Sequence, residues 1–173
     1  GAGHLSATGA WVDVNGQDVL FVPVDLQSQG WVGSPRDQLR TLQARTIHEH
    51  ILRQTGGTGY PVVVGGDLNL VGSREPLLVL IQGLDVDGSD LMPVNAPRIG
   101  EHTLVTWRNA DSIFAPGRLD FLLVPDAAVT VTNSFVFGTE DLDSEMLRRL
   151  ELERGLSAGL SDHLVVVGDL TFR

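Results

Sequence analysis

Two short polar segments stand at the ends of apolar strands, and they carry the residues that could do chemistry. Gly66-Asp67-Leu68-Asn69 directly follows the apolar run Pro61–Val64. Ser161-Asp162-His163-Leu164 directly precedes the apolar run Val165–Val167. Runs of β-branched residues are typical of buried strands, and polar groups at buried strand ends need partners. The two segments could therefore face each other across a cleft and hold a divalent metal and a phosphate.

The residue types fit the hydrolysis of a phosphoester. Carboxylate and carbonyl oxygens suit a hard cation such as Mg²⁺, and hydrolysis needs an activated water and neutralised phosphoryl charge. Asp67 could orient or deprotonate the water, and Asn69 could donate to a phosphate oxygen. Asp162 could hold the metal, and His163 could donate to a phosphoryl oxygen. Asp120, within an apolar strand, could fix the imidazole tautomer and raise its pKa.

Composition limits the class of protein. The chain has 173 residues, 42% of them hydrophobic, which is enough for one globular domain with a core. It has no cysteine, which excludes disulfides and thiolate metal sites without fixing the compartment, and no apolar run approaches the ~20 residues of a membrane span. The net charge is -10, so the chain as a whole lacks the basic surface that a duplex-binding protein usually carries. Two arginine clusters are interpreted as solvated helix faces: Arg36, Arg40 and Arg45, and Arg148, Arg149 and Arg154.

Strands with helices inserted between them predict one α/β domain with a mixed sheet. Asn15-Gly16 joins the first two strands as a hairpin turn. Ser34 and Pro35 begin a helix whose core face is predicted at Leu39, Leu42, Ile47 and Ile51. The strands are expected at 10–14, 18–23, 61–65, 103–107, 118–124, 129–136 and 164–169, and the helices at 34–54, 75–82 and 143–154.

Three motifs, in order, carry a resemblance to a known family. Gly66-Asp67-Leu68-Asn69 matches G-D-x-N, Arg118-Leu119-Asp120-Phe121 matches R-[IL]-D-[YF], and Ser161-Asp162-His163 matches S-D-H. Thr106-Trp107 also fits. The chain thus resembles the endonuclease/exonuclease/phosphatase superfamily, the metal-dependent phosphodiesterases that include DNase I-like nucleases, neutral sphingomyelinases and inositol polyphosphate phosphatases. The likeness extends from about Trp11 to Leu170.

The resemblance implies roles for individual residues. Asp67 would position or activate water, and Asn69 would support it and contact phosphate or a second metal. Asp162, with Asp67 and Asn69, would hold Mg²⁺ or Mn²⁺. His163 would contact the scissile phosphate, backed by Asp120. Trp107 and Arg118 could bind substrate or simply pack, and both alternatives stay open. Trp31 is a further candidate for substrate contact, whereas four other histidines are interpreted as structural or surface residues: His4, His48, His50 and His102.

The resemblance also implies a DNase I-like layered β-sandwich flanked by helices, of which residues 1–173 form a single truncated domain. The N-terminal part of that fold, with an Asn-bearing strand and a metal-binding Glu, has no counterpart in this chain, and Gly1–His4 is where it would join. We expect a missing N-terminal segment, a second chain or self-association to complete the fold, since exposed sheet edges are a liability.

Two functions follow, from different classes. The first is a metal-dependent phosphodiester hydrolase, or the C-terminal part of one, acting on a small molecule, a lipid head group or a nucleic acid. The second is a catalytically incomplete domain that serves as a binding or assembly module. Asp25 favours the second, because it stands where the family often has a His, and an ionised carboxylate repels phosphate unless it recruits a metal.

Overall fold

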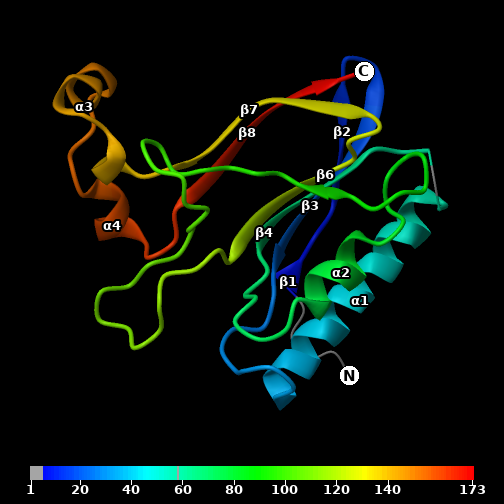
Figure 1. Ribbon diagram of the computed structural model, residues 1–173. Coiled ribbons are helices and arrows are strands. Elements are labelled where there is room, and N and C mark those ends of the chain that lie inside the picture. The colour runs from blue at the N-terminus through cyan, green and yellow to red at the C-terminus, as the bar shows by residue number, and fades with distance from the viewer. Residues whose placement is uncertain (1–5, 58) are drawn as a thin grey trace.

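Helices cover one face of a mixed sheet and a second, smaller sheet covers the other, so the chain forms three layers (Figure 1). The computed structural model describes residues 6–57 and 59–173. The junction predicted at Gly1–His4, and His4 itself, lie outside the described residues.

The larger sheet has six strands in the order β1-β3-β4-β6-β5, with β2 also paired to β3. β3 and β4 run parallel, and the other neighbours are antiparallel. β1 and β2 follow the same edge of β3 in a continuous register, so they act as one interrupted edge strand. The strands are β1 (Ser6–Ala7), β2 (Ala10–Val14), β3 (Gln17–Asp25), β4 (Val62–Asp67), β5 (Met92–Pro93) and β6 (Asp120–Val124).

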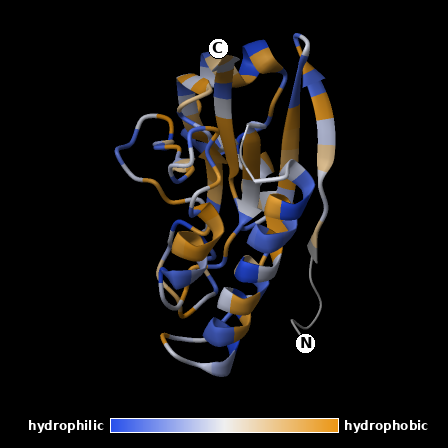
Figure 2. Ribbon diagram, turned by 90° about the vertical axis from the view of Figure 1, so that its right-hand side faces the viewer, coloured by the Kyte–Doolittle hydropathy of each residue, from blue (hydrophilic) through white to orange (hydrophobic). Residues whose placement is uncertain are grey.

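Alternate residues of these strands enter two separate cores, because successive side chains point to opposite faces of a sheet. In β4, Val62 and Val64 join the core beneath the helices, whereas Val63 joins the core beneath the second sheet. Figure 2 shows hydrophobic residues along the strands in the middle of the molecule. A strand buried on both faces explains the continuous apolar run after Pro61.

The second sheet pairs β7 (Val129–Phe137) with β8 (Val165–Phe172) in antiparallel fashion. Val136 and Leu164 pack with Val63 and Val124 of the larger sheet. Two packed sheets with helices outside confirm the layered α/β expectation. The 3-10 turn η1 (Thr139–Asp141) and the helices α3 (Ser144–Leu150) and α4 (Leu156–Leu160) form the excursion between β7 and β8 (Figure 1).

The long helix α1 (Pro35–Thr55) packs with α2 (Glu75–Ile81) against the larger sheet. Ser34 caps α1 by accepting from Asp37 N, and Gly56 ends it in a left-handed conformation. The predicted core face is correct at Ile47 and Ile51 but wrong at Leu42, which is 43% exposed. Among the described residues no helix is both long and apolar enough to cross a membrane.

Two other elements differ from the expectation. Residues 103–107 form no strand, and Trp107 makes only isolated bridges with Gly117 and His163. The segment is instead held at isolated points by backbone hydrogen bonds, such as Trp107 N to Gly117 O at 3.0 Å and Leu164 N to Thr106 O at 2.7 Å. The single helix predicted over 143–154 is split into α3 and α4, because Glu151 adopts a left-handed conformation that ends α3.

Candidate active site

Three carboxylates stand side by side in adjacent strands. Asp25 of β3 pairs in register with Asp67 of β4, and Asp67 pairs with Asp120 of β6. The alternation of each strand turns these residues toward the second sheet, the face that holds Val63 and Val124. Asp25, Asp67 and Asp120 therefore form a row of acidic groups on the face of the larger sheet that packs against the smaller sheet.

Asp67 and Asn69 form a rigid pair just after β4. The backbone N–H of Asn69 donates to Asp67 Oδ1 at 2.8 Å, and Asn69 Nδ2 donates to Asp67 Oδ2 at 2.6 Å. Asn69 Nδ2 also donates to Leu26 O at 2.9 Å, and the side chain is buried. Gly66 permits this turn, since it has φ 138° and an added Cβ would lie 2.0 Å from Val24 O.

Asp120 and His163 form a second pair. His163 Nδ1 lies 2.9 Å from Asp120 Oδ2, which assigns the proton to Nδ1 and leaves Nε2 toward the cleft. Nε2 lies 3.9 Å from Asp67 Oδ2. Thr106 Oγ1 accepts from the backbone N–H groups of Leu119 and Asp120 at 3.0 and 2.9 Å. The segment predicted as a strand thus anchors the start of β6 by a hydroxyl instead.

Asp162 is held by the loop that follows residue 106. Its Oδ2 accepts from Trp107 Nε1 at 2.9 Å and from Asn109 Nδ2 at 3.3 Å. The hydrogen bond from Trp107 is the main cause that lowers the pKa of Asp162. Trp107, predicted to bind substrate or pack, therefore orients a carboxylate at the rim of the site.

Two further residues of the site, Asp67 and His163, also have perturbed pKa values. Burial raises the pKa of Asp67 to about 6, with the charges of Asp120 and Asp25 acting in the same direction and the N–H of Asn69 and the charge of His163 acting against it. Burial lowers the pKa of His163, but the hydrogen bond and charge of Asp120 and the charge of Asp67 outweigh it, so that pKa is raised. A base that titrates near neutrality and an imidazole that holds its proton are suited to proton transfer.

The donor groups fit a divalent cation. One ligand atom each from Asp67, Asp120 and His163 lies within 4.8 Å of the others. Two carboxylates suit Mg²⁺ or Mn²⁺. The structure thus groups Asp67 with Asp120 and His163, whereas the sequence predicted Asp67 with Asn69 and Asp162. The ligand roles of Asn69 and Asp162 remain predictions.

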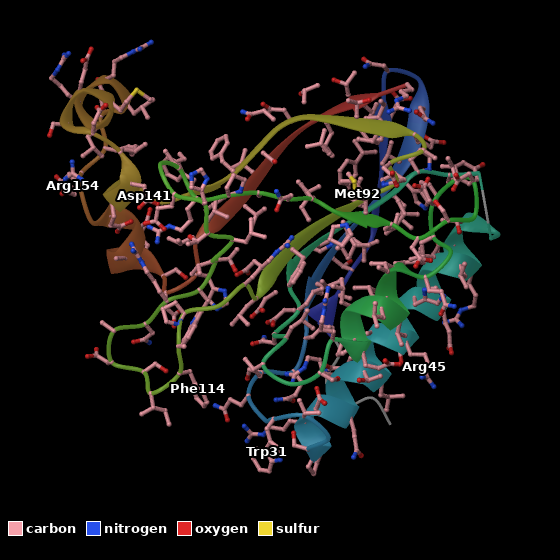
Figure 3. All side chains as sticks on the ribbon, in the orientation of Figure 1. Trp31, Arg45, Met92, Phe114, Asp141 and Arg154 are labelled. Carbon is pink, nitrogen blue, oxygen red and sulfur yellow. The ribbon has the colours of Figure 1, made fainter. Side chains whose placement is uncertain are left out.

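Asp67, Asp162 and His163 line an open cleft of about 870 Å³, and Asp120 lies behind His163. One wall is the segment 25–30, another is the turn 69–71, and a third is the loop that contains Phe114. Phe114 and Trp31 project from separate loops at the same end of the molecule (Figure 3). Arg118 contributes to the lining, but its guanidinium lies 4.2 Å from the Phe121 ring centroid and donates to Val94 O at 2.8 Å.

Sequence reasoning missed several supporting residues. Arg40 was placed on a solvated face but is 0% exposed, and Gln43 is 3% exposed. Counting back from Ile51 and Ile47 by three and four residues reaches Ala44, Gln43 and Arg40, so the helical period could have found them. Thr106 was identified only through the Thr106-Trp107 match to the family, without a role, and Asn109 had no comparable signal.

The model of the Endonuclease/Exonuclease/phosphatase family matches residues 6–163. The chain belongs to this family. The match spans the Asp67–Asn69 turn, Asp120 and His163, as the motifs predicted. No curated protein matches the sequence.

Solved structures share the fold. A humanised D. rerio TDP2 superposes with a TM-score of 0.61 at 22% identity, covering 95% of this chain and 60% of its own. The human Nocturnin catalytic domain superposes with a TM-score of 0.59 at 16% identity, and the match covers 96% of this chain and 52% of that domain. The Bacteroides thetaiotaomicron mannosyl-6-phosphatase Bt3783 superposes with a TM-score of 0.54 at 18% identity, and the match covers 91% of this chain and 53% of that enzyme. This chain therefore spans about half to three fifths of the length of these structures.

Proposed function

We propose that the chain carries the phosphate-handling part of a divalent-metal-dependent phosphodiesterase site. The observation that supports this most is the convergence of two hydrogen-bonded pairs, Asp67–Asn69 and Asp120–His163, with His163 Nε2 3.9 Å from Asp67 Oδ2. A gap of this width accommodates a water or a phosphoryl oxygen between a base and a proton donor.

Each pair has a distinct task in this proposal. Asp67 accepts a proton from, or orients, the attacking water, and Asn69 holds that carboxylate in place. His163 donates from Nε2 to a phosphoryl oxygen, and Asp120 keeps its ring oriented and charged. Asp67, Asp120 and the predicted ligand Asp162 would hold the cation, which supplies charge neutralisation at the phosphoryl group.

The cleft favours a substrate with one negative charge at phosphorus. Asp25, Asp67 and Asp162 line it, and Arg118 and His163 are the cationic side chains among its lining residues. A net charge of -10 opposes long polyanions. We propose a small or lipid-linked phosphodiester before duplex DNA. One structural relative, D. rerio TDP2, was solved with a single-strand DNA product, so single strands are the alternative to test.

Hydrolysis of bis-p-nitrophenyl phosphate with Mg²⁺ or Mn²⁺ tests the proposal, on this chain and on any longer protein that contains it. Asp67→Ala and His163→Ala should each lower turnover by at least about 100-fold. His102→Ala, at an exposed position, is the matched control and should leave turnover unchanged. Equal turnover in Asp67→Ala and the wild type would overturn the assignment.

A binding or assembly module is the second candidate. Asp25 favours it, because a third carboxylate in register with Asp67 repels an anionic substrate. This candidate gains if neither the chain nor the longer protein shows metal-dependent turnover on a broad phosphoester panel while phosphate or a divalent ion still binds by calorimetry.

A further inference from the structure

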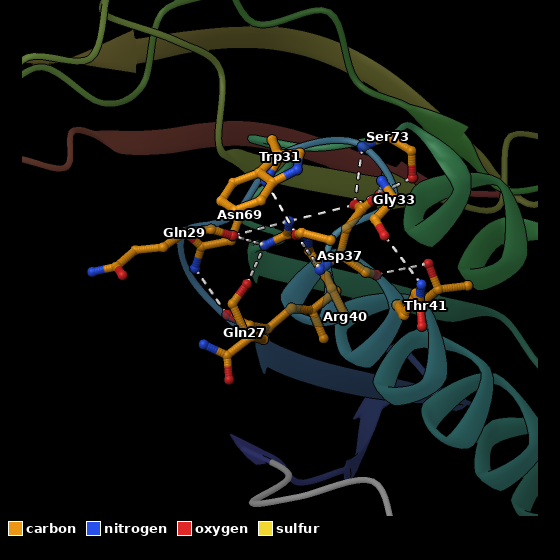
Figure 4. A network of polar contacts seen from close by, with 12 residues as sticks. Gln27, Gln29, Trp31, Gly33, Asp37, Arg40, Thr41, Asn69 and Ser73 are labelled. Carbon is orange, nitrogen blue, oxygen red and sulfur yellow. Dashed lines mark hydrogen bonds and ion pairs between the residues drawn. The ribbon is translucent and has the colours of Figure 1, made fainter.

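Arg40 lies at the centre of a buried network behind the cleft (Figure 4). It projects from the first half of α1 and is 0% exposed. Its guanidinium donates to Gln27 O and, at 3.3 Å, to Gln29 O, and it lies 3.4 Å from Asp37 Oδ1. Burying a guanidinium carries a large desolvation penalty, and an apolar side chain would pack here without it. The presence of a charged residue at this position is therefore not explained by stability alone.

Gln27 is held from both sides by one face of α1. Arg40 binds its carbonyl oxygen, and Gln43 Oε1 accepts from its backbone N–H at 2.8 Å. Arg40 and Gln43 are three residues apart, so they lie on neighbouring turns of the same helix face. Both polar groups of the Gln27 backbone thus have a fixed position relative to α1.

The preceding residue, Leu26, contacts Asn69, which is the partner of the candidate base Asp67. Leu26 O accepts from Asn69 Nδ2 at 2.9 Å, and the same amide donates to Asp67 Oδ2 at 2.6 Å. A displacement of Gln27 would move Leu26 O, and Asn69 would then lose one of the two acceptors that orient its amide. The contacts from Arg40 to Asp67 are thereby continuous through backbone and side-chain hydrogen bonds.

Asp37 extends the same support to the second wall of the cleft. Its Oδ2 accepts from Gly33 N at 2.9 Å, and its Oδ1 accepts from Ser73 N at 3.0 Å. Gly72 packs so closely that an added Cβ would lie 2.2 Å from Asp37 Oδ1. The loop before α1, at Gly33, and the segment after the Asp67–Asn69 turn, at Ser73, are therefore both held by Asp37 in the first turn of α1.

We propose that Arg40 and Gln43 are positioning residues for the site: they fix Gln27, and through Leu26 they orient Asn69 against Asp67. The catalytic part of this inference rests on the proposed function, whereas the structural part does not. Groups that orient the residues of a site commonly change activity by about 10- to 100-fold. We expect a loss of kcat of about tenfold, with KM changed less, because Gln43 is only one of many residues that line the cleft and Arg40 is not among them.

Three variants separate positioning from folding. Gln43→Leu removes the acceptor for Gln27 N without creating an unpaired charge, and Gln43→Glu restores an acceptor oxygen there. Arg40→Met removes the donor to Gln27 O. Arg45→Met is the matched control, since Arg45 projects outward from the same helix (Figure 3) and is exposed.

The readouts are hydrogen exchange of the Asn69 side-chain amide by NMR and kcat and KM for bis-p-nitrophenyl phosphate, with circular dichroism to select folded variants. Exchange should accelerate in Gln43→Leu and Arg40→Met, return toward the wild-type rate in Gln43→Glu, and stay unchanged in Arg45→Met. Unchanged exchange in folded Gln43→Leu would overturn the inference, as would faster exchange with unaltered kcat. If the wild type has no turnover, the proposed function fails, and the exchange of Asn69 still decides the positioning role.

Discussion

Replacing Asp67 with Asn should make the folded protein more stable at neutral pH. Burial and neighbouring charges raise the pKa of this carboxyl from its ordinary 3.8 to about 6. Each pKa unit corresponds to about 1.4 kcal/mol, so ionised Asp67 lowers the free energy of unfolding by about 3 kcal/mol above pH 6. The side chain is 18% exposed, which keeps solvent screening small. A neutral amide at this position escapes the penalty.

The pH dependence has a definite sign. Below pH 3.8 the carboxyl is protonated in both the folded and the unfolded chain, and the penalty is absent. Between that pH and about 6 the folded chain binds the proton more tightly, so stability falls as pH rises. The stability of Asp67→Asn relative to the wild type should therefore rise by roughly 2.5 kcal/mol between pH 4 and pH 7. A pH-independent loss of about 1 kcal/mol accompanies it, because one Asn69 donor loses its acceptor.

Urea unfolding of both proteins between pH 4 and pH 7, with a chelator present, measures this difference. Other titrating groups are shared and cancel in the comparison. Parallel stability profiles across that range would refute the reasoning, since they would mean that Asp67 ionises as easily in the folded protein as in the unfolded chain. Added Mn²⁺ should reverse the order by stabilising the wild type more than the variant.

Three further outcomes are expected. In the wild type with a chelator present, the Asp67 carboxyl should titrate near pH 6 in a carbon-detected NMR titration, because burial raises its pKa; titration near the ordinary 3.8 would contradict that cause. Asp120→Asn should lower the pKa of His163 in an NMR titration, because the hydrogen bond and charge of that carboxylate raise it; an unchanged value would contradict the pairing. Gly66→Ala should lower the free energy of unfolding in urea by at least about 3 kcal/mol, since the added Cβ would lie 2.0 Å from Val24 O. Gly65→Ala is the control and should lower it by under about 1 kcal/mol, because its nearest contact would be at 3.7 Å. Similar losses in both variants would argue against steric exclusion at Gly66.

The pairing of Asp120 with His163 could be predicted from the sequence because each sits in a short motif at a strand end. Strand alternation then fixes which face each side chain occupies, and the two strand ends meet at one seam. The same local logic predicted the Asp67–Asn69 turn. The Asp67–Asn69 turn is local in the chain, whereas Asp120 and His163 are 43 positions apart and are each marked by the residue types of a short motif.

The buried side of α1 could not be predicted in the same way. Its inward face begins with Asp37, Arg40 and Gln43, whose polarity suggests solvent unless their backbone partners in the loops are known. The orientation of Asp162 also depends on distant partners, because Trp107 lies 55 positions away in the sequence. Residues 103–107 read as a strand by composition, yet they pair through a hydroxyl and isolated bridges.

The hydrogen bond between Asp120 and His163 joins one sheet to the other. Asp120 belongs to β6 of the larger sheet, and His163 precedes β8 of the smaller one. The smaller sheet could detach in a partial opening while the helices stay packed on the larger sheet, since the two cores are separate. On heating, loss of the imidazole from the cleft would then precede melting of the main sheet. Any hydrolysis that depends on the cleft would then be lost at a temperature below the calorimetric transition, and cooling before that transition would restore the site.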